Sequence, residues 1–314
     1  MGQYAGGLIT FTDQSNVDTN MGAITNVGID PNIDVVSDDG GEIYDESLSL
    51  TGYAPVANFS TKTLDVLFGA IGLQGECVGP SPALVKQVDV IVRRLKTCKD
   101  ALSGTPHIRY RNPLGLLRLN GLSMDRGGDA VASAILDMLT DGSNAPLAVT
   151  DGVALPTPRL TRQFTLGKAL IAGVLFDDID GADVSFNVTT TSKEPAMGDI
   201  TPDEIGVLKV RPVLTLRSRD LTRIKAGLIE LTGKAGTHLN CLLQLIRRKN
   251  SGIFEDFADP VHINITLNGL VVPDSILNAS GQSRATNSIK MMTSFDGTNA
   301  PIVFDLAATY DSSP

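Results

Sequence analysis

The sequence has no tryptophan, and aromatic residues make up only 5% of its 314 residues. Sites that bind sugars or stack nucleobases usually present exposed aromatic rings, so this scarcity argues against both kinds of site. Hydrophobic residues still make up 42% of the chain, which is enough for a large core and argues against bulk disorder. That core must be built mainly from Val, Ile, Leu and Ala.

Cysteine is also scarce, with only Cys77, Cys98 and Cys241 and no C-x-x-C spacing. An odd number without paired spacing provides neither a disulfide framework nor a zinc site, and free thiols are typical of a reducing compartment. The opening residues, MGQYAGGLITF, lack the basic and apolar regions of a signal peptide. No apolar run reaches the roughly 18 residues of a membrane span. We therefore expect no signal peptide and no membrane.

Motifs of catalysis and cofactor binding are missing as well. The chain has no G-x-S-x-G nucleophile elbow, no H-E-x-x-H metal motif and neither of the glycine-rich phosphate-binding patterns. We therefore predict a protein that is not an enzyme and that holds no metal or cofactor. An active site assembled from distant residues is the alternative that the sequence leaves open.

Positive charge is in the minority. The formal net charge is −9 and the isoelectric point is near 4.8, which argues against wrapping DNA or an anionic membrane, because both need clustered Lys and Arg. Residues 1–157 hold 10 basic and 18 acidic side chains, whereas residues 158–314 hold 16 and 17. The two halves of the chain therefore differ in surface charge.

Two short segments are nearly identical: DGSNAP at Asp141–Pro146 and DGTNAP at Asp296–Pro301, 155 residues apart. One such turn could recur by chance, because these are ordinary turn residues, but a colinear series of matches predicts a duplicated domain. We predict tandem domains at 1–157 and 158–314; the alternative is two similar but unrelated β-domains. The other matches, at shifts of 154 to 157, are Gly41-Glu42-Ile43 with Gly198-Asp199-Ile200, Pro55-Val56 with Pro212-Val213, Leu64 with Leu221, Val92-Arg93-Arg94 with Ile246-Arg247-Arg248, His107-Ile108 with His262-Ile263, and Gly115-Leu116-Leu117 with Gly269-Leu270-Val271.

Each half is expected to be β-rich with one helix. Alternation of apolar and polar residues predicts strands, and apolar residues three and four positions apart predict a helix. The Asp-Gly turns predict a terminal hairpin in each half. The expected fold is mainly β with α, as two tandem β-sandwich or barrel units. In the first and second half respectively, the expected elements are a strand at 27–33 or 184–188, a strand at 48–59 or 207–216, a helix at 60–72 or 218–233, and a strand at 85–95 or 239–248.

The densest acidic run, from Asp30 to Glu46, has seven carboxylates and no basic residue. Its spacing does not fit an EF-hand calcium loop. A solvated hairpin tip, in which Gly40-Gly41 allow a tight turn, is the simplest interpretation; a surface that repels a polyanion is another. A similar acidic turn occurs at 177–183. The candidate acidic residues of the two loops are Asp38, Asp39, Glu42, Asp45, Asp178 and Asp180.

Two basic pairs, Arg93-Arg94 and Arg247-Arg248, end the strands predicted at 85–95 and 239–248. They could pair with acidic loops of a neighbouring subunit, or they could be solvated strand ends, because surface ion pairs contribute little to stability. His107 and His262 occupy matching positions in the two halves, which makes them poor candidates for one shared catalytic or metal centre.

A duplicated β-domain with one helix per copy, a long polar hairpin loop and an acidic balance resembles the major tail tube proteins of long-tailed bacteriophages. The resemblance extends over the whole chain as organisation, and it is most evident in Phe59–Phe68 and in the loops near 37–46 and 191–203. Members of that family form rings of six β-sandwich or barrel units, and the rings stack into a hollow tube through which DNA leaves the capsid.

The resemblance implies a structural virion protein, located in the tail and assembled in the cytoplasm of a host bacterium. A chain with two units needs three copies per ring, so we expect a homotrimer with pseudo-sixfold symmetry. Its partners would be further copies of itself and other tail proteins such as the tape measure and the tail terminator, and DNA would pass without specific binding. The acidic candidates would face the lumen or the next ring, and the Arg pairs would lie between subunits.

Two other kinds of function remain as alternatives. Another virion part, such as a ring, adaptor, baseplate or decoration protein, would share the duplication but would not stack into long tubes. A β-sandwich module that binds or processes carbohydrate would need a cleft lined by aromatic rings or carboxylates, which the lack of tryptophan disfavours.

Overall fold

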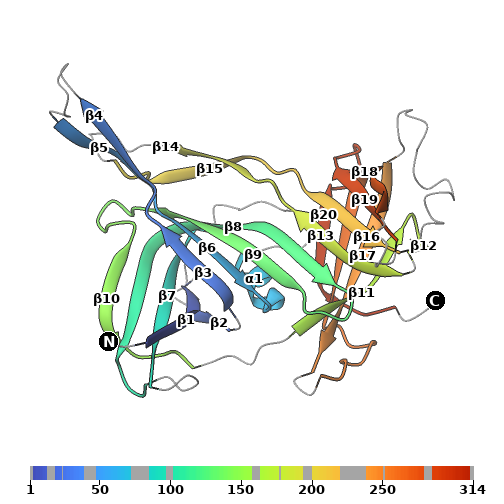
Figure 1. The fold of residues 1–314 in the computed structure, drawn as a ribbon, viewed down its shortest axis with the longest axis horizontal. Coiled ribbons are helices and arrows are strands. Elements are labelled where there is room, and N and C mark those ends of the chain that lie inside the picture. Colours follow the sequence, from blue (N-terminus) through green and yellow to red (C-terminus); the bar gives the residue numbers. More distant parts are fainter. Residues whose placement is uncertain are drawn as a thin grey trace.

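The computed structural model of the chain describes residues 3–12, 18–22, 24–38, 47–71, 85–96, 102–157, 163–176, 178–193, 200–219, 238–249, 252–278 and 285–311. These residues are mainly β, in large antiparallel sheets, with one short helix (Figure 1). The expectation of a mainly β chain that carries helix is confirmed at this level. The helix predicted at 218–233 falls largely outside the described residues.

The described residues of the first half form ten strands and the helix α1. In chain order they are β1 (Gln3–Thr12), β2 (Asp18–Met21), β3 (Ile24–Asp30), β4 (Ile33–Asp38), β5 (Ser47–Tyr53), β6 (Val56–Thr61), α1 (Leu64–Ile71), β7 (Val85–Leu95), β8 (His107–Asp125), β9 (Val131–Leu139) and β10 (Ala148–Val153).

In the second half, the part that the structure describes also forms ten strands. They are β11 (Gln163–Ile171), β12 (Val174–Leu175), β13 (Ile179–Ser185), β14 (Thr189–Lys193), β15 (Glu204–Lys209), β16 (Val213–Ser218), β17 (His238–Arg248), β18 (His262–Asn278), β19 (Thr286–Thr293) and β20 (Ile302–Ala308).

Strand pairing follows the same pattern in both halves. In the first half β1 pairs with β2 and β7, β8 pairs with β7, β9 and β10, β6 pairs with β3 and β9, and β4 pairs with β5. Adding ten to each strand number gives the pairs of the second half. All of these pairs are antiparallel. Each pair in one half therefore has a counterpart in the other, which defines counterpart residues by register.

Burial follows the period of two that antiparallel strands require. In β16, Leu214, Leu216 and Ser218 are buried, whereas the Arg217 side chain is exposed. The core is one cluster that draws residues from both halves. Phe68 of α1 packs on Phe304 of β20 with ring centroids 5.3 Å apart. The helix of the first half is thus covered in part by a strand of the second.

Three of the predicted strands, those at 27–33, 48–59 and 207–216, are interrupted. The strand expected at 27–33 ends at Asp30, because Pro31 has no amide hydrogen to donate and Asn32 adopts a positive φ of 40°. The strand expected at 48–59 is interrupted by Ala54-Pro55 between β5 and β6. The same interruption occurs at 210–212, between β15 and β16. The breaks free β4–β5 and β14–β15 from the main sheet as separate two-stranded hairpins.

The two DG-x-NAP turns have the same hydrogen bonds. Asp141 Oδ1 accepts the Asn144 amide at 2.6 Å, and Asp296 Oδ1 accepts the Asn299 amide at 2.6 Å. The prediction of hairpins at these turns is wrong, because the strands on either side do not pair with each other. β9 and β10 both pair with β8, and β19 and β20 both pair with β18.

Gly115 and Gly269, matched in the sequence, occupy counterpart positions of β8 and β18 where neighbouring strands come close. A Cβ on Gly269 would overlap the Met292 backbone, and one on Gly115 would overlap the side chains of Asn112 and Leu136. Glycine is therefore required by close packing at both positions.

Candidate functional site

The two halves meet where β13 adds to the free side of β8, which makes one sheet continuous across the chain (Figure 1). We name this contact the joint. Its register places Asp183 opposite Ser123 and Val184 opposite Leu122. Val184 and Leu122 are buried, whereas Ser123 and Asp183 lie on the polar face. The alternation of buried and polar positions thus continues across the joint without a break.

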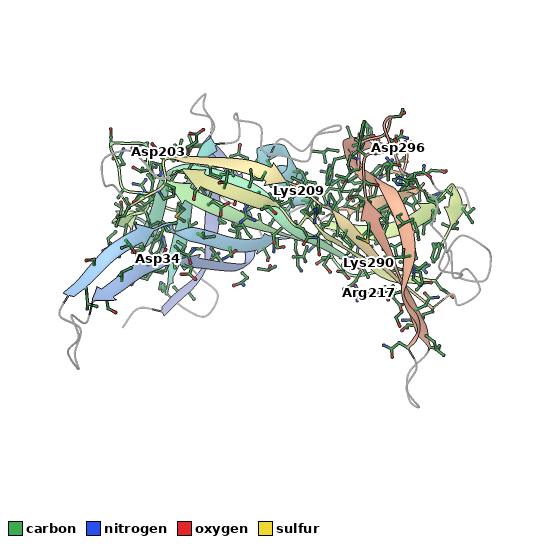
Figure 2. The ribbon with its side chains drawn as sticks, turned by 90° about the horizontal axis from the view of Figure 1, so that it is seen from above. Asp34, Asp203, Lys209, Arg217, Lys290 and Asp296 are labelled. Atoms are coloured by element: carbon green, nitrogen blue, oxygen red, sulfur yellow. The ribbon has the colours of Figure 1, made fainter. Side chains whose placement is uncertain are left out.

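The polar face of the joint is held by a charged network. Ser123 Oγ donates to Asp183 Oδ1 at 2.6 Å. Arg217 Nη2 lies 2.9 Å from Asp125 Oδ1 and 3.1 Å from Asp183 Oδ2, so it bridges the two halves. These side chains are about half exposed, and their ion pairs are therefore worth little individually. Figure 2 shows Arg217 beside Lys290 on this face of the sheet.

The acidic turn of the second half lies beside the joint. Arg126 Nη1 lies 3.9 Å from Asp178 Oδ1, and the Arg126 amide donates to the Asp180 carbonyl at 3.0 Å. Arg219 Nη2 lies 2.7 Å from Asp180 Oδ1. The candidates Asp178 and Asp180 are therefore engaged by arginines within the chain, one of them from the first half.

Asp38 lies away from that turn. It is the last residue of β4, at the end of the hairpin that projects from the molecule in Figure 1. Asp39, Glu42 and Asp45 lie outside the described residues.

One residue of the basic pairs crosses between the halves. Arg248 Nη1 lies 3.5 Å from Asp129, and its Nη2 donates to the Gly127 carbonyl at 2.9 Å. Both acceptors belong to the turn between β8 and β9. Arg248 thus pairs with one aspartate of the other half of the same chain, and pairing of the basic pairs with acidic loops of a neighbouring subunit stays a prediction.

The strand register corrects the match of the basic pairs by one residue. The Arg94 and Arg247 amides each donate to a buried histidine, His107 Nδ1 and His262 Nδ1, both at 3.1 Å. Arg94 is therefore the counterpart of Arg247, at a shift of 153 rather than 154, and Arg93 is not a counterpart of Arg247. The two histidines accept a strand amide each and are well separated structural residues.

The hairpin β14–β15 reaches from the second half over the first. The Tyr53 amide donates to the Ile200 carbonyl at 3.0 Å, and the Thr140 amide donates to the Pro202 carbonyl at 3.2 Å. In Figure 2, Asp203 at the start of β15 lies over the first half, while Lys209 at its end lies nearer the middle. We name β14–β15 the second arm and its counterpart β4–β5 the first arm.

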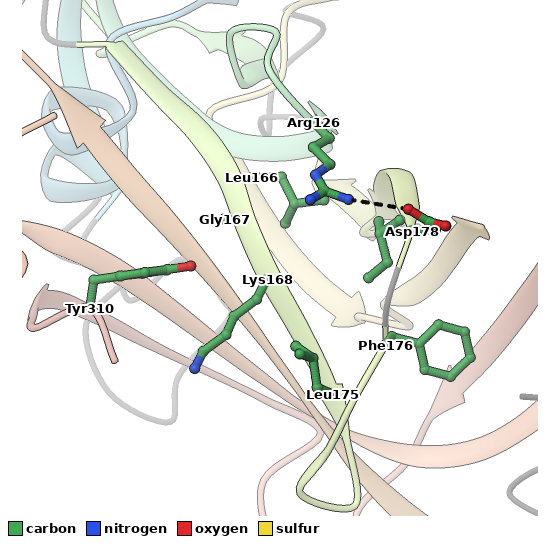
Figure 3. Close-up of a pocket in the computed structure, with 9 residues that line it drawn as sticks. Arg126, Leu166, Gly167, Lys168, Leu175, Phe176, Asp178 and Tyr310 are labelled. Carbon is green, nitrogen blue, oxygen red and sulfur yellow. Dashed lines mark ion pairs between the residues drawn. The ribbon is translucent and has the colours of Figure 1, made fainter. Parts of the chain in front are cut away.

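A pocket of about 200 Å³ lies next to the joint (Figure 3). Arg126 of the first half and Lys168, Asp178 and Tyr310 of the second are among its lining residues. Lys168 Nζ lies 3.3 Å from Asp311 and over the Tyr310 ring, and burial raises the Tyr310 pKa. Small-molecule sites usually measure about 300–1,000 Å³, and the polar groups here are engaged with one another.

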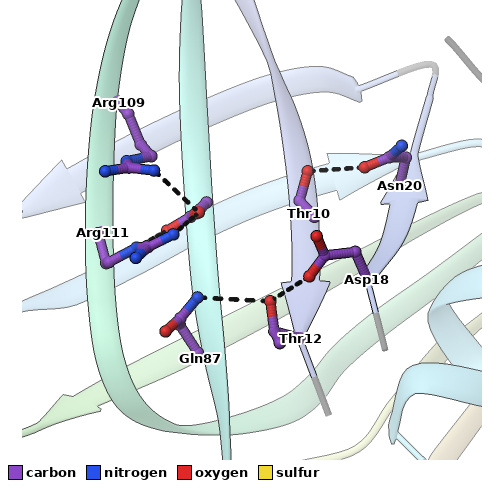
Figure 4. A network of polar contacts seen from close by, with 8 residues as sticks. Thr10, Thr12, Asp18, Asn20, Gln87, Arg109 and Arg111 are labelled. Atoms are coloured by element: carbon purple, nitrogen blue, oxygen red, sulfur yellow. Dashed lines mark hydrogen bonds and ion pairs between the residues drawn. The ribbon is translucent and has the colours of Figure 1, made fainter. Parts of the chain in front are cut away.

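A polar network covers the sheet of β1, β2, β7 and β8 (Figure 4). Arg111 makes two hydrogen bonds to Asp89, at 2.8 and 2.7 Å, and Arg109 Nη1 lies 4.0 Å from the same carboxylate. The hydrogen bond to Asp89 raises the pKa of Arg111. Asp89 and Arg111 lie on neighbouring central strands of the sheet, so we interpret the network as cross-strand stabilisation.

No group of three or more His, Cys, Asp or Glu side chains that could hold a metal ion occurs among the described residues. Cys241 is fully buried, and burial raises its thiol pKa to about 12. Within the described part of the chain, no helix is long and apolar enough to cross a membrane. No protein-family model matches the chain, and no curated protein matches it.

The residues of the joint were missed by the sequence analysis. Ser123, Asp125 and Arg217 belong to no motif, and Asp183 was noted only as the end of the acidic turn at 177–183; the four residues come from three strands. One signal was present: β13 continues the alternation of a half-buried strand, so its two edges needed partners. The sequence does not specify which strand supplies the second partner.

Proposed function

We propose that the protein is a structural virion protein, the major tail tube subunit of a long-tailed bacteriophage. On this proposal three copies form a ring with pseudo-sixfold symmetry, and rings stack around a channel for DNA. Tail proteins such as the tape measure and terminator would be its other partners, and the site of action would be the virion tail.

The proposal rests first on the repeated pairing of the strands. Two halves with the same order of antiparallel pairs support a tandem duplication of one β-sandwich or barrel unit, at 1–157 and 158–314. Counterpart bulges support it further, because both β3 and β13 shift register against their partner at the same step, Ile24/Asn26 and Ile179/Gly181. Unrelated β-domains would not be expected to share such irregularities.

The observation that carries the ring is the joint itself. It is heterologous, because the end of β8 in one unit meets the edge of β13 in the next. A heterologous contact that repeats gives a closed ring or an open filament. The counterpart edges, on β3 and on the end of β18, have no strand partner among the described residues. Further copies can therefore extend the same sheet.

The polar face of the joined sheet supports a channel wall. Its charges are of both signs and largely paired: Arg118 lies 2.6 Å from Asp137, and Arg217 bridges Asp125 and Asp183. The described residues of this face form no cluster of unpaired basic side chains, so a DNA backbone would find few counterions to hold it. The net charge of −9 per chain acts in the same direction.

Electron microscopy of the purified protein tests the proposal. Rings of three chains with a hole wide enough for duplex DNA, and their stacking into tubes, are expected. A chain that stays monomeric at high concentration would overturn it. Single rings that never stack would favour the alternative of an adaptor, baseplate or other ring component of the virion.

A further inference from the structure

The joint is an interface between two strand edges. The counterparts of both edges occur elsewhere in the chain, where they have no strand partner among the described residues. In the joint, β13 of the second half offers its edge to the end of β8 in the first. The counterpart of β13 is β3, whose described pairing is with β6 only. The counterpart of the end of β8 is the end of β18, which pairs with β19 on one side. Along the path β18–β19–β16–β13–β8–β9–β6–β3 the two free edges lie at opposite ends, and they do not pair with each other among the described residues.

We propose that copies of this chain join head to tail by pairing the edge of β3 with the end of β18 of the preceding copy. The inference deepens the proposed ring function and rests on it. The register follows from the counterparts: Asp183 corresponds to Gly28, and Ser123 corresponds to Asn278, because β18 has one extra residue between Ser275 and Asn278. Gly28 of one copy therefore lies opposite Asn278 of its neighbour.

Burial at the counterpart positions points to a missing neighbour. Ala182 and Val184 of β13 are fully buried at the joint, whereas their counterparts Val27 and Ile29 in β3 are only half-buried. Leu277, at the end of β18, is 60% exposed. Apolar side chains on an unpaired edge are an aggregation hazard unless a specific partner covers them. The preceding copy would cover Val27 and Ile29, and the following copy would cover Leu277.

The arms give the same direction of contact. The second arm lies over the first half, and its Ile205 and Val207 are half-buried. Their counterparts in the first arm are Leu48 and Leu50, which are 70% and 49% exposed. The first arm would lie over the second half of the preceding copy, where Phe295 is 64% exposed at the counterpart position of the buried Thr140.

A third exposed position lies on β10. Its Val149 is 60% exposed, although its counterpart Phe304 in β20 is buried against α1 of the preceding half. The first half thus covers Phe304 of the second half through α1, whereas Val149 of the first half has no such cover among the described residues. All three surfaces of the first half, β3, the first arm and β10, would meet the preceding copy.

The chemistry of the new joint differs from that within the chain. Arg217, Asp125 and Asp183 hold the internal joint with charge. At the intermolecular joint Gly28 and Asn278 carry no charge, and Asp30 lies opposite Ser275 and forms no ion pair with it. Assembly through β3 should therefore depend on apolar burial and backbone pairing, and it should depend only weakly on salt.

Disulfide trapping tests the register. Arg126 and Phe186 donate across the joint to Asp180 and Asn120, so Asp183–Ser123 is a non-hydrogen-bonded pair, in which side chains are closest. Cysteines at 28 and 278 should therefore reach disulfide geometry. A Cβ on Gly28 meets no atom within 4 Å, so Gly28→Cys should not disturb the fold.

The experiment uses the full chain with Cys77→Ser and Cys98→Ser, carrying Gly28→Cys and Asn278→Cys together. Mild oxidation should give covalent dimers and trimers on a non-reducing gel. The matched control, Gly28→Cys with Leu277→Cys, is one residue out of register; it should give monomer.

The outcomes separate the interface from the function. Rings seen by microscopy without the in-register crosslink, or with equal crosslinking of the control pair, would overturn the β3–β18 pairing and leave the ring. A parent protein that is monomeric at every concentration and forms no crosslink would overturn both. A crosslink that forms in register with rings of three chains supports both.

Discussion

Ser123 and Asp183 face each other across the joint between the two halves, with Ser123 Oγ donating to Asp183 Oδ1 at 2.6 Å. Beside this polar pair lies a buried one, Leu122 opposite Val184. The polar pair identifies the register, and the buried pair supplies most of the energy, because burial of apolar side chains outweighs exposed polar contacts.

Truncating the buried pair should loosen the chain itself. Val184→Ala removes two buried methyl groups and should lower the free energy of unfolding by about 2–3 kcal/mol. The matched variant is Ile29→Ala, at the counterpart position, which is half-buried in one chain and should cost less than about 1.5 kcal/mol there. Urea unfolding of dilute monomer measures both. Equal losses would contradict the difference in burial on which the intermolecular joint is argued.

The network around Asp89 predicts a charge-dependent loss of stability. Asp89 is 8% exposed and accepts two hydrogen bonds from Arg111. Asp89→Asn keeps the size but removes the charge and one acceptor, so we expect a loss of about 1–3 kcal/mol. Asp151→Asn, on the exposed strand β10, should change the stability by less than about 0.5 kcal/mol. Thermal or urea unfolding of the two variants compares them, and an unchanged Asp89→Asn protein would show that the network contributes nothing.

The hydrogen bonds of the DGTNAP turn predict a carboxylate that stays ionised at unusually low pH. Hydrogen bonds from the Asn299 amide and side chain lower the pKa of Asp296 from 3.8 to about 2. Because the folded pKa is below the unfolded one, this turn stabilises the fold fully above pH 4, and the contribution is lost as the pH falls through 2. Carboxyl chemical shifts followed by NMR should show Asp296 titrating near pH 2 and Asp141 also below its usual value. Titration of Asp296 near 4 would show that these bonds do not persist in solution.

The thiol of Cys241 should be inert in the folded protein. It is fully buried, and burial raises its pKa to about 12, so almost no thiolate exists at pH 8. Iodoacetamide at pH 8, followed by peptide mass spectrometry, should leave Cys241 unmodified until urea unfolds the chain. Modification at the same rate with and without urea would contradict its burial.

The sequence predicted local features well and long-range partners poorly. The DG-x-NAP turns and the strand at 85–95 are where they were expected, because turn chemistry and alternation are local properties. The hairpins expected at those turns do not exist, since β10 pairs with β8 and not with its sequence neighbour β9. Pairing of that kind depends on which edge is free in three dimensions.

The residues of the joint illustrate the same limit. Arg217 looks like an ordinary exposed strand residue, and only the arrival of β8 beside β13 places it between Asp125 and Asp183. The sequence match of the basic pairs was wrong by one residue. Two adjacent arginines match at a shift of 154, but the hydrogen bonds to His107 and His262 show that the true shift is 153. Strand register is set by backbone pairing, and an identical residue at the next position in the sequence does not change it.

The first arm allows assembly to be separated from folding. Leu48 and Leu50 project from the same face of β4–β5 and are largely exposed in one chain. Leu48→Asp with Leu50→Asp should therefore leave the melting temperature of dilute monomer nearly unchanged. The same pair of charges should prevent assembly, because each would be buried without a partner against the preceding copy.

Ser49 supplies the control, since it lies between the two leucines and points to the opposite face of the hairpin. Ser49→Asp adds a charge to the same arm and should still assemble. Sedimentation velocity at increasing concentration compares the three proteins. If the double leucine variant forms the same oligomers as the parent, the arm does not contact the preceding copy. If Ser49→Asp is equally defective, both faces of the arm are buried, and the contact is not the one that the second arm makes with the first half.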